Sequence, residues 1–288
     1  MKFLLYGGNG WIGSKVSNFI AQLNHEVVFG RSRVDDVNQV KSEIKVVNPD
    51  RIICMIGRTH GEGYSTIDYL EQKDKLHENI RDNLFGPLVL RELSSQTNIH
   101  LTYLGTGCIF NYDENHTETN GFNEDDSPNF FGSSYSVVKG FTDRLFHFEN
   151  NNSLNVRIRM PISSDFSPRN FIKKITSYEK ICSIPNSMTV LEELLPIMID
   201  LSIKKHTGTV NLTNPGVITH NQILQYYKDI VEPEFTWSNF SIEEQSKILR
   251  SDRSNNYLDT NILKTLYPEI NDIHSAVKNT LNNMKKSS

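Results

Sequence analysis

The chain has 288 residues, of which 37% are hydrophobic and 22% charged, and its formal net charge is -4. This hydrophobic share supports a buried core, so a disordered chain is excluded. The total of 30 Lys and Arg against 34 Asp and Glu leaves no basic surplus, and we expect no nucleic-acid partner. Three scattered cysteines and nine histidines without ligand spacing predict neither a disulfide framework nor a metal site.

Apolar runs in the chain are short. The N-terminal run over residues 3–6 stops at Gly7, whereas a signal peptide needs an apolar core of ~7–15 residues. No stretch approaches the ~18 apolar residues of a membrane span. We therefore expect a cytoplasmic protein without a membrane partner.

The first half of the chain alternates short apolar runs with helical patterns. Strands are predicted at residues 3–6, 26–29, 51–56, 100–104 and 155–160. Helical spacing of apolar residues appears over 12–23, over 83–93, and in a stripe that begins at Val138 and continues through Phe141, Leu145 and Phe148. This alternation predicts the α/β class, with a Rossmann-type doubly wound parallel sheet.

A glycine-rich segment, residues 7–13, follows the first predicted strand and opens the first predicted helix. Its G-x-x-G-x-x-G spacing in this context predicts a dinucleotide-binding turn. Gly7 would form the tight turn, Gly10 would admit a pyrophosphate, and Gly13 would let the helix approach the sheet. The helix N-terminus favours the anion. The remaining predicted cofactor contacts in this segment are Asn9, Trp11 and Ile12.

The end of the second strand indicates which nicotinamide cofactor binds. A carboxylate there would favour NAD, whereas an arginine accommodates the 2′-phosphate of NADP. Arg31 and Arg33 follow this strand, and the acidic residues come later. We expect NADPH, with Arg31 as the first candidate ligand and Arg33 as the second; the alternative is that both are solvated loop residues.

After residue 160 prolines become frequent and the predicted elements become shorter. We predict an NADP-binding Rossmann domain over residues 1–160. Residues 161–288 are expected to form mainly a smaller C-terminal substrate-binding lobe, with some elements returning to the sheet. Prolines are expected to break this part into short elements; they are Pro161, Pro168, Pro185, Pro196, Pro215 and Pro233.

Tyr135 and Lys139 form a Y-x-x-x-K pattern on a predicted helix, which places both on one face. A tyrosine, with an ordinary pKa near ~10, needs a nearby cation to act in acid–base catalysis at neutral pH. Lys139 supplies that cation. Thr106, after the fourth strand, could bond a substrate carbonyl.

With the glycine motif, these residues resemble the extended short-chain dehydrogenase/reductase family. The resemblance implies hydride transfer from a nicotinamide, with Tyr135 as proton donor and as a contact of the cofactor, Lys139 as its tuner and ribose anchor, and Thr106 completing the triad. Asn83 matches the family's helical asparagine. The segment 54–57 departs from the family's usual Asn-Ala-Ala-Gly.

Cys108 lies two residues beyond Thr106, so strand alternation places both side chains on the same side, at the sheet edge where ligands bind. Most free cysteines are buried apolar residues, and we interpret Cys54 and Cys182 in that way. A thiol beside a ketosugar can instead exchange the acidic protons next to the ketone. Lys174 is a candidate partner, although the sequence does not separate it from Lys173.

Longer strings resemble the family of bifunctional UDP-4-keto-6-deoxyglucose 3,5-epimerase/4-keto-reductases, nearly end to end. They include residues 106–110, 157–165, 168–172, 184–189 and 253–256. The resemblance implies that Cys108 and Lys174 are the epimerisation acid/base pair and that a nucleotide sugar is the substrate. Candidates for holding this sugar, each of which could equally be structural, are Arg169, Asn170, Arg253 and Asn256.

Two alternatives stay open. A plain 4-keto-reductase would receive an already epimerised sugar and would need no thiol at position 108. A non-catalytic NADPH-binding regulatory subunit would not need an intact Thr106, Tyr135 and Lys139. The fold also makes a homodimer through the helices beside Tyr135 plausible.

Overall fold

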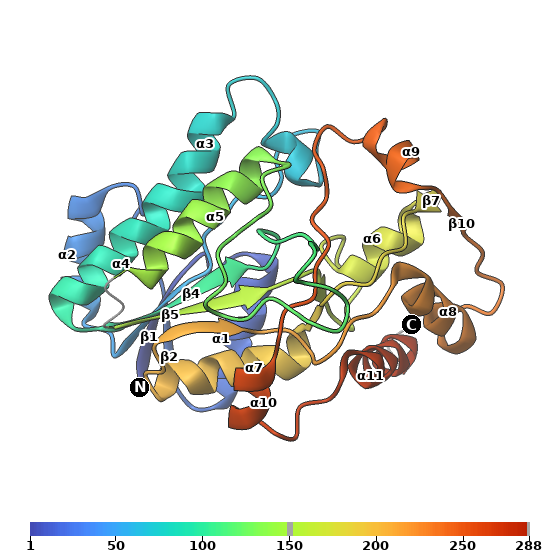
Figure 1. Ribbon diagram of the computed structural model, residues 1–288. Helices are drawn as coiled ribbons and strands as arrows, with labels where there is room; N and C mark the ends of the chain where they lie inside the picture. The colour runs from blue at the N-terminus through green and yellow to red at the C-terminus, as the bar shows by residue number, and fades with distance from the viewer. Residues whose placement is uncertain (149–151, 287–288) are drawn as a thin grey trace.

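The computed structural model describes residues 1–148 and 152–286. Its centre is a six-stranded sheet in the order β2-β1-β3-β4-β5-β9 with parallel pairing throughout (Figure 1). This confirms the predicted doubly wound sheet. The strands are β1 (Lys2–Tyr6), β2 (Glu26–Phe29), β3 (Arg51–Cys54), β4 (His100–Thr106), β5 (Ser153–Ile158) and β9 (Gly208–Asn211).

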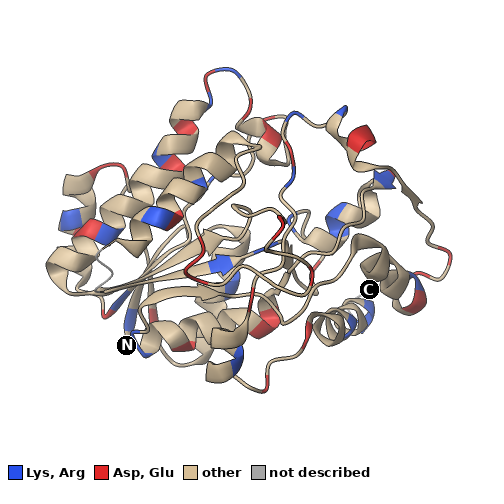
Figure 2. Cartoon of the chain, viewed as in Figure 1, with Lys and Arg blue, Asp and Glu red and all other residues tan. Residues whose placement is uncertain are grey.

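Both faces of the sheet are covered by helices (Figure 1). Alternate residues of β1 enter different cores: Phe3 and Leu5 face one side, Leu4 and Tyr6 the other. The first side carries α1 (Trp11–Gln22) and α7 (Leu191–Ile203), and the second carries α2 (Val37–Val47), α4 (Gly86–Thr97) and α5 (Ser134–His147). Basic and acidic residues are mixed along the outer helices (Figure 2).

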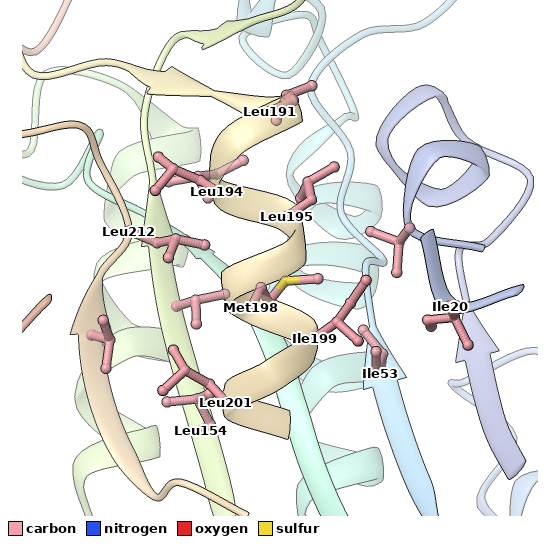
Figure 3. Packing of buried hydrophobic residues seen from close by; sticks show 14 of the residues in the cluster. Ile20, Ile53, Leu154, Leu191, Leu194, Leu195, Met198, Ile199, Leu201 and Leu212 are labelled. Carbon is pink, nitrogen blue, oxygen red and sulfur yellow. The ribbon is translucent and has the colours of Figure 1, made fainter. Parts of the chain in front are cut away.

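Helix α7 lies along the sheet and buries almost a whole face, with Leu194, Leu195, Met198 and Ile199 inaccessible to solvent (Figure 3). The helix continues through Pro196, where the sequence predicted a break. A proline inside a helix costs about 3 kcal/mol or more, whereas each fully buried leucine contributes about 1.5–3 kcal/mol. Several buried side chains therefore outweigh one lost hydrogen bond.

Most of the remaining chain forms a smaller lobe beside the carboxyl ends of the strands, with its own apolar core. The lobe elements are β6 (Pro161–Ile162), α6 (Phe171–Ser177), β7 (Lys180–Ile181), β8 (Thr189–Val190), α8 (His220–Ile230), β10 (Ser238–Asn239), α9 (Ile242–Ser246) and α11 (Ile273–Lys286). In contrast, α7 and β9 belong to the layers of the main sheet, and α10 (Asn261–Leu266) packs beside β9. In the part of the chain that is described, no helix has the length and apolarity to cross a membrane.

Several elements differ from the sequence prediction. Strand β5, for example, begins and ends two residues before the strand predicted at 155–160. Strand β3 ends at Cys54, two residues early, because β1 turns away at Gly7 after pairing Tyr6 with Cys54. The helix predicted at 83–93 belongs to a longer run of α3 (Leu76–Ile80), a π-helical turn at Arg81–Phe85, and α4. Helix α2 was not predicted, and a 3-10 turn, η1 (Ile67–Tyr69), precedes α3.

A buried ion pair fastens α5 to β5. Arg157 donates two hydrogen bonds to Asp143, from Nε at 2.9 Å and from Nη2 at 2.7 Å, and neither residue is exposed. Removing one partner of such a pair leaves an uncompensated buried charge. We expect Asp143→Asn to lower the free energy of unfolding by about 3–5 kcal/mol in chemical denaturation. A loss below about 1 kcal/mol would contradict this role, and Asp229→Asn on the exposed face of α8 is the matched control.

Candidate active site

The turn between β1 and α1 has the backbone that the glycine motif predicts. Gly7 has φ +82°, and a Cβ there would lie 2.8 Å from the Met55 carbonyl. A Cβ on Gly13 would lie 2.3 Å from the Gly7 oxygen, so both positions require glycine. Gly10 meets only that same oxygen, at 3.3 Å, and is otherwise open. The turn therefore forms a backbone cradle that an anionic dinucleotide fits.

The N-terminus of α1 faces this cradle. Gly10 is the N-cap, no side chain caps the helix, and the first turn carries no acidic residue. Its free N–H groups suit a pyrophosphate. The side chains of Trp11 and Ile12 pack against the core, and the Trp11 indole donates to Asp165 at 2.9 Å. Asn9 is exposed at the mouth of the turn.

The two arginines after β2 differ in their surroundings. The Arg33 guanidinium donates to Asp35 at 3.0 Å. Arg31 is exposed, its backbone N–H donates to Glu43 at 2.7 Å, and its guanidinium contacts no partner among the described residues. Arg31 is therefore the freer of the two to meet a phosphate.

Thr106 and Tyr135 come together at the end of β4. Tyr135 lies in the first turn of α5 and is buried, and the neighbouring Thr106 side chain acts to lower the pKa of its hydroxyl. The helix start is fixed by the Ser133 side chain, which accepts the Ser136 N–H, and by Glu71, which accepts the Ser134 N–H at 2.8 Å. Burial, followed by the nearby Cys108, raises the pKa of Tyr135, so the phenol holds its proton.

Lys139 lies one turn further along α5 and is buried at the centre of the sheet. Its ammonium donates to the hydroxyl of Tyr103, a fully buried residue of β4, and lies 4.5 Å from the centre of that ring. Burial lowers the pKa of Lys139 to about 8. The lysine is therefore a cation whose charge is sensitive to pH just above neutrality.

Tyr135 and Cys108 line one cleft of about 800 Å³, between the sheet and the smaller lobe. This volume lies within the range of small-molecule sites. The Cys108 loop is fixed by its own N–H, which donates to Thr106 at 3.1 Å, and by its carbonyl, which accepts from Ser136 at 2.7 Å. Apolar and aromatic residues form much of the wall; they include Phe130, Met160, Phe171 and Tyr178.

Three of the basic residues predicted from the sequence lie beside this cleft. Arg253 lines it and is paired with Asp68 at 2.6 Å. The pKa of Lys174 is lowered by burial and by the charges of Arg169 and Arg253. Arg169 is exposed and donates to His60. Lys174 is itself not a lining residue, although Phe171 and Ile175 of the same helix are.

The two predicted asparagines expose no surface. Asn170 caps α6, and its amide donates to the Ser163 carbonyl at 2.6 Å and the Asp165 carbonyl at 2.7 Å. Asn256 donates to the carbonyls of Gly107 and Phe110, both at 2.9 Å. In this structure neither faces the cleft. Asn256 holds the loop at 107–110, whose Cys108 lines the cleft, and Asn170 caps the helix whose Phe171 lines it.

Two residues near the cleft were missed from sequence. Arg159 contacts the Cys108 sulfur at 3.7 Å, and His220 lines the cleft with its Nε2 buried and unpartnered. The signal for Arg159 was an arginine directly after a buried strand, in the segment 157–159. His220 had none, because α8 reaches the cleft only through the tertiary fold. The predicted Asn83 lies in the π-helical turn, where its side chain bonds the backbone of Arg58.

The sheet, the glycine cradle and the Thr106–Tyr135–Lys139 group define a dinucleotide-binding protein of the extended short-chain dehydrogenase/reductase class. No family model matches the chain. The chain is 42% identical over 279 residues to the bifunctional dTDP-4-dehydrorhamnose 3,5-epimerase/dTDP-4-dehydrorhamnose reductase of Arabidopsis thaliana, covering 96% of this chain and 90% of that protein.

Two solved structures add to this comparison. The L780 UDP-rhamnose synthase of Acanthamoeba polyphaga mimivirus superposes with a TM-score of 0.96 at 55% identity, covering 98% of this chain and 99% of that one. A dTDP-4-dehydrorhamnose reductase of Clostridium acetobutylicum shares the fold, with a TM-score of 0.81 at 16% identity over 98% and 99% of the two chains. This chain belongs to the family of bifunctional deoxysugar-nucleotide 3,5-epimerase/4-keto-reductases.

Proposed function

We propose that this protein converts UDP-4-keto-6-deoxy-D-glucose to UDP-L-rhamnose, by inverting C3 and C5 and then reducing C4 with NADPH. One observation carries the proposal: a thiol, Cys108, and a buried tyrosine of reductase type, Tyr135, line the same cleft. The relative solved as a UDP-rhamnose synthase supports the choice of substrate.

Epimerisation uses the acidity of protons next to the C4 ketone. Cys108 and Lys174 act as the acid/base pair, one removing a proton from carbon and the other returning one to the opposite face. The enolate oxygen that forms in between accepts hydrogen bonds from Tyr135 and Thr106.

Reduction follows in the same cleft. Bound NADPH supplies the hydride that C4 accepts. Tyr135 donates its proton to the C4 oxygen, and the buried cation of Lys139 stabilises the phenolate that remains. Thr106 holds the carbonyl oxygen in line with Tyr135.

The proposal also assigns the residues that contact the substrate and the parts of the chain that bind cofactor and substrate. Arg169 and Arg253 are the candidate contacts for the diphosphate, since a guanidinium can make bidentate contacts with phosphate oxygens. Asn170 and Asn256 support these contacts from behind. We keep the division into a cofactor-binding domain over residues 1–160 and a substrate lobe over most of 161–288.

A plain 4-keto-reductase is the rival activity. It requires no thiol in the cleft, so Cys108 beside Tyr135 argues against it. A non-catalytic regulatory subunit does not need the buried Tyr135 and Lys139 pair. Incubating the protein with UDP-4-keto-6-deoxyglucose and NADPH, and identifying the product by NMR, tests the proposal. UDP-L-rhamnose is expected; a product that keeps the original configuration at C3 and C5 would favour the rival.

The choice of NADPH depends on Arg31. A hydrogen bond to a charged group contributes about 1.5–3 kcal/mol, which corresponds to roughly 10–100-fold in affinity. We expect Arg31→Gln to raise the KM for NADPH by about this factor and to leave the KM for NADH nearly unchanged. A larger rise in Arg33→Gln would assign the 2′-phosphate to Arg33 instead.

The reduction step is expected to depend on pH through Lys139. Because its pKa is lowered to about 8, the lysine loses its charge above that pH, while Tyr135 stays protonated. We expect kcat/KM for reduction to be level below pH 7 and to fall by about tenfold per unit well above pH 8. Lys139→Arg keeps a cation at every pH and should abolish this fall. If kcat/KM still fell above pH 8 in Lys139→Arg, the fall would have to come from the titration of another group.

We also infer a homodimer and a cytoplasmic location. The helices beside Tyr135 present apolar side chains to solvent, including Phe85 and Phe141, which are 46% and 60% exposed. Exposed apolar patches mark association surfaces, and the mass in solution tests the assembly. The three cysteines are free, which agrees with a reducing compartment.

A further inference from the structure

Arg159 is a buried arginine that no step above uses. It follows β5 directly and is 1% exposed. The next residue, Met160, has φ +39°, a conformation that side chains other than glycine rarely adopt, and it lines the cleft. Backbone strain of this kind concentrates at functional sites. The chain therefore holds this arginine beside the cleft at a conformational cost.

The hydrogen-bond partners of Arg159 are all uncharged groups. Nη1 donates to the Ser254 hydroxyl at 2.7 Å and the Gly107 carbonyl at 3.3 Å, and Nη2 donates to the Asn186 amide oxygen at 2.5 Å. Its Nε is buried without a partner, and no carboxylate pairs with it among the described residues.

Arg157, two residues earlier, is the useful contrast. It is equally buried but makes a bidentate pair with Asp143. Buried charges are normally paired in this way, because an uncompensated charge in the interior is costly. Among the described residues, the ionisable group that the Arg159 guanidinium contacts is the Cys108 thiol, whose sulfur lies 3.7 Å from Nη1.

We propose that Arg159 is a positioning residue that supplies the counter-charge of the Cys108 thiolate. The inference rests on the proposed role of Cys108 in proton transfer. The Ser254 hydroxyl and the Gly107 carbonyl hold Nη1, and Asn186 holds Nη2, so these hydrogen bonds keep the guanidinium beside the sulfur. A thiolate at Cys108 gives the buried Arg159 guanidinium an anionic partner, and the guanidinium in turn favours the thiolate over the thiol.

This arrangement separates two tasks. Lys174 is free to carry a proton because Arg159, and not Lys174, keeps the thiol reactive. An arginine suits the first task because it remains charged at every accessible pH, whereas a lysine can gain and lose a proton.

The test is the rate of iodoacetamide alkylation of each cysteine, measured by peptide mapping without substrate. An ordinary thiol alkylates at pH 7 with about 0.03 of its rate at pH 10, because only that share is thiolate. We expect a ratio above about 0.3 for Cys108 in the wild-type protein. Cys182 lines the same cleft without a guanidinium contact and is the internal control, since burial raises its pKa.

In Arg159→Met, alkylation of Cys108 at pH 7 should fall about tenfold and recover at pH 10, whereas Arg159→Lys should retain most of the rate. Lys174→Met should change it by less than about threefold. The inference would be overturned if the rate of Cys108 alkylation at pH 7 were only about 0.03 of the rate at pH 10 in the wild-type protein. It would also be overturned if Lys174→Met slowed this alkylation and Arg159→Met did not. The wild-type measurement decides even if Arg159→Met does not fold. A different result would separate this inference from the proposed function. If Arg159→Met slowed Cys108 alkylation while Cys108→Ala still exchanged the sugar protons, the role of Arg159 would be supported and the epimerase role of Cys108 refuted.

Discussion

Tyr135→Phe is expected to lower kcat for reduction of the 4-keto sugar by about 10²–10⁴-fold, the usual contribution of a positioned acid. The phenol is buried beside Thr106, and burial raises its pKa, so at neutral pH it holds the proton that the C4 oxygen requires. Tyr135→Phe removes only the hydroxyl, so the proton donor is lost without a large cavity being opened. NADPH oxidation with the pre-epimerised 4-keto sugar measures the effect directly.

The control for this change is Tyr226→Phe, on α8 and away from the cleft, where the hydroxyl bonds His274 at 3.1 Å. That variant should keep wild-type kcat. The affinity for NADPH should fall far less than kcat in Tyr135→Phe, because Lys139 and the glycine cradle remain. If Tyr135→Phe kept more than about a tenth of the wild-type kcat, another group would have to supply the proton.

Cys108→Ala is expected to reduce the yield of UDP-L-rhamnose from UDP-4-keto-6-deoxyglucose by at least ~10²-fold. Reduction of a sugar that is already inverted at C3 and C5 should continue within about threefold of wild type, since hydride transfer needs no thiol. The two activities separate because Tyr135 and Cys108 act on different bonds in one cleft.

Cys182→Ala is the matched control, because that cysteine lines the same cleft and lies 7% exposed. It should leave both activities near wild type. Equal loss of both activities in Cys108→Ala would indicate a structural role, since the loop at 107–110 is held by Asn256. Full activity in Cys108→Ala would leave only a plain reductase.

Local sequence signals predicted the parts of the fold that depend on them. The turn at Gly7 and the helix after it follow from glycine spacing, and their neighbours β1 and β2 follow from apolar runs. Helix α2 was missed because its buried stripe contains Val40 and Ile44, β-branched residues that are typical of strands. The predicted stripe lies in α5 from Val138 to Leu145, but the helix ends at His147, so Phe148 lies beyond it. Phe141 points outward, and periodicity does not indicate which partner a face meets.

Tyr135 and Lys139 were predictable as catalytic candidates because they form a motif, whereas the residues that support the site were not. Arg159 reaches Ser254 across 95 residues, and Asn256 reaches Gly107 across 149. Contacts between residues so far apart in the chain produce no recognisable spacing pattern in the sequence. For the same reason Asn170 and Asn256 were predicted to touch substrate, although the structure buries them behind the loops of the site.

Proton exchange in deuterated water tests the central claim most directly. The wild-type protein is incubated with UDP-4-keto-6-deoxyglucose without NADPH, the sugar is followed by NMR, and NADPH is then added. We predict deuterium at C3 and C5 before NADPH, followed by UDP-L-rhamnose that carries both labels. Oxidation of NADPH to give a product without deuterium at either carbon would contradict a bifunctional enzyme and leave a simple reductase.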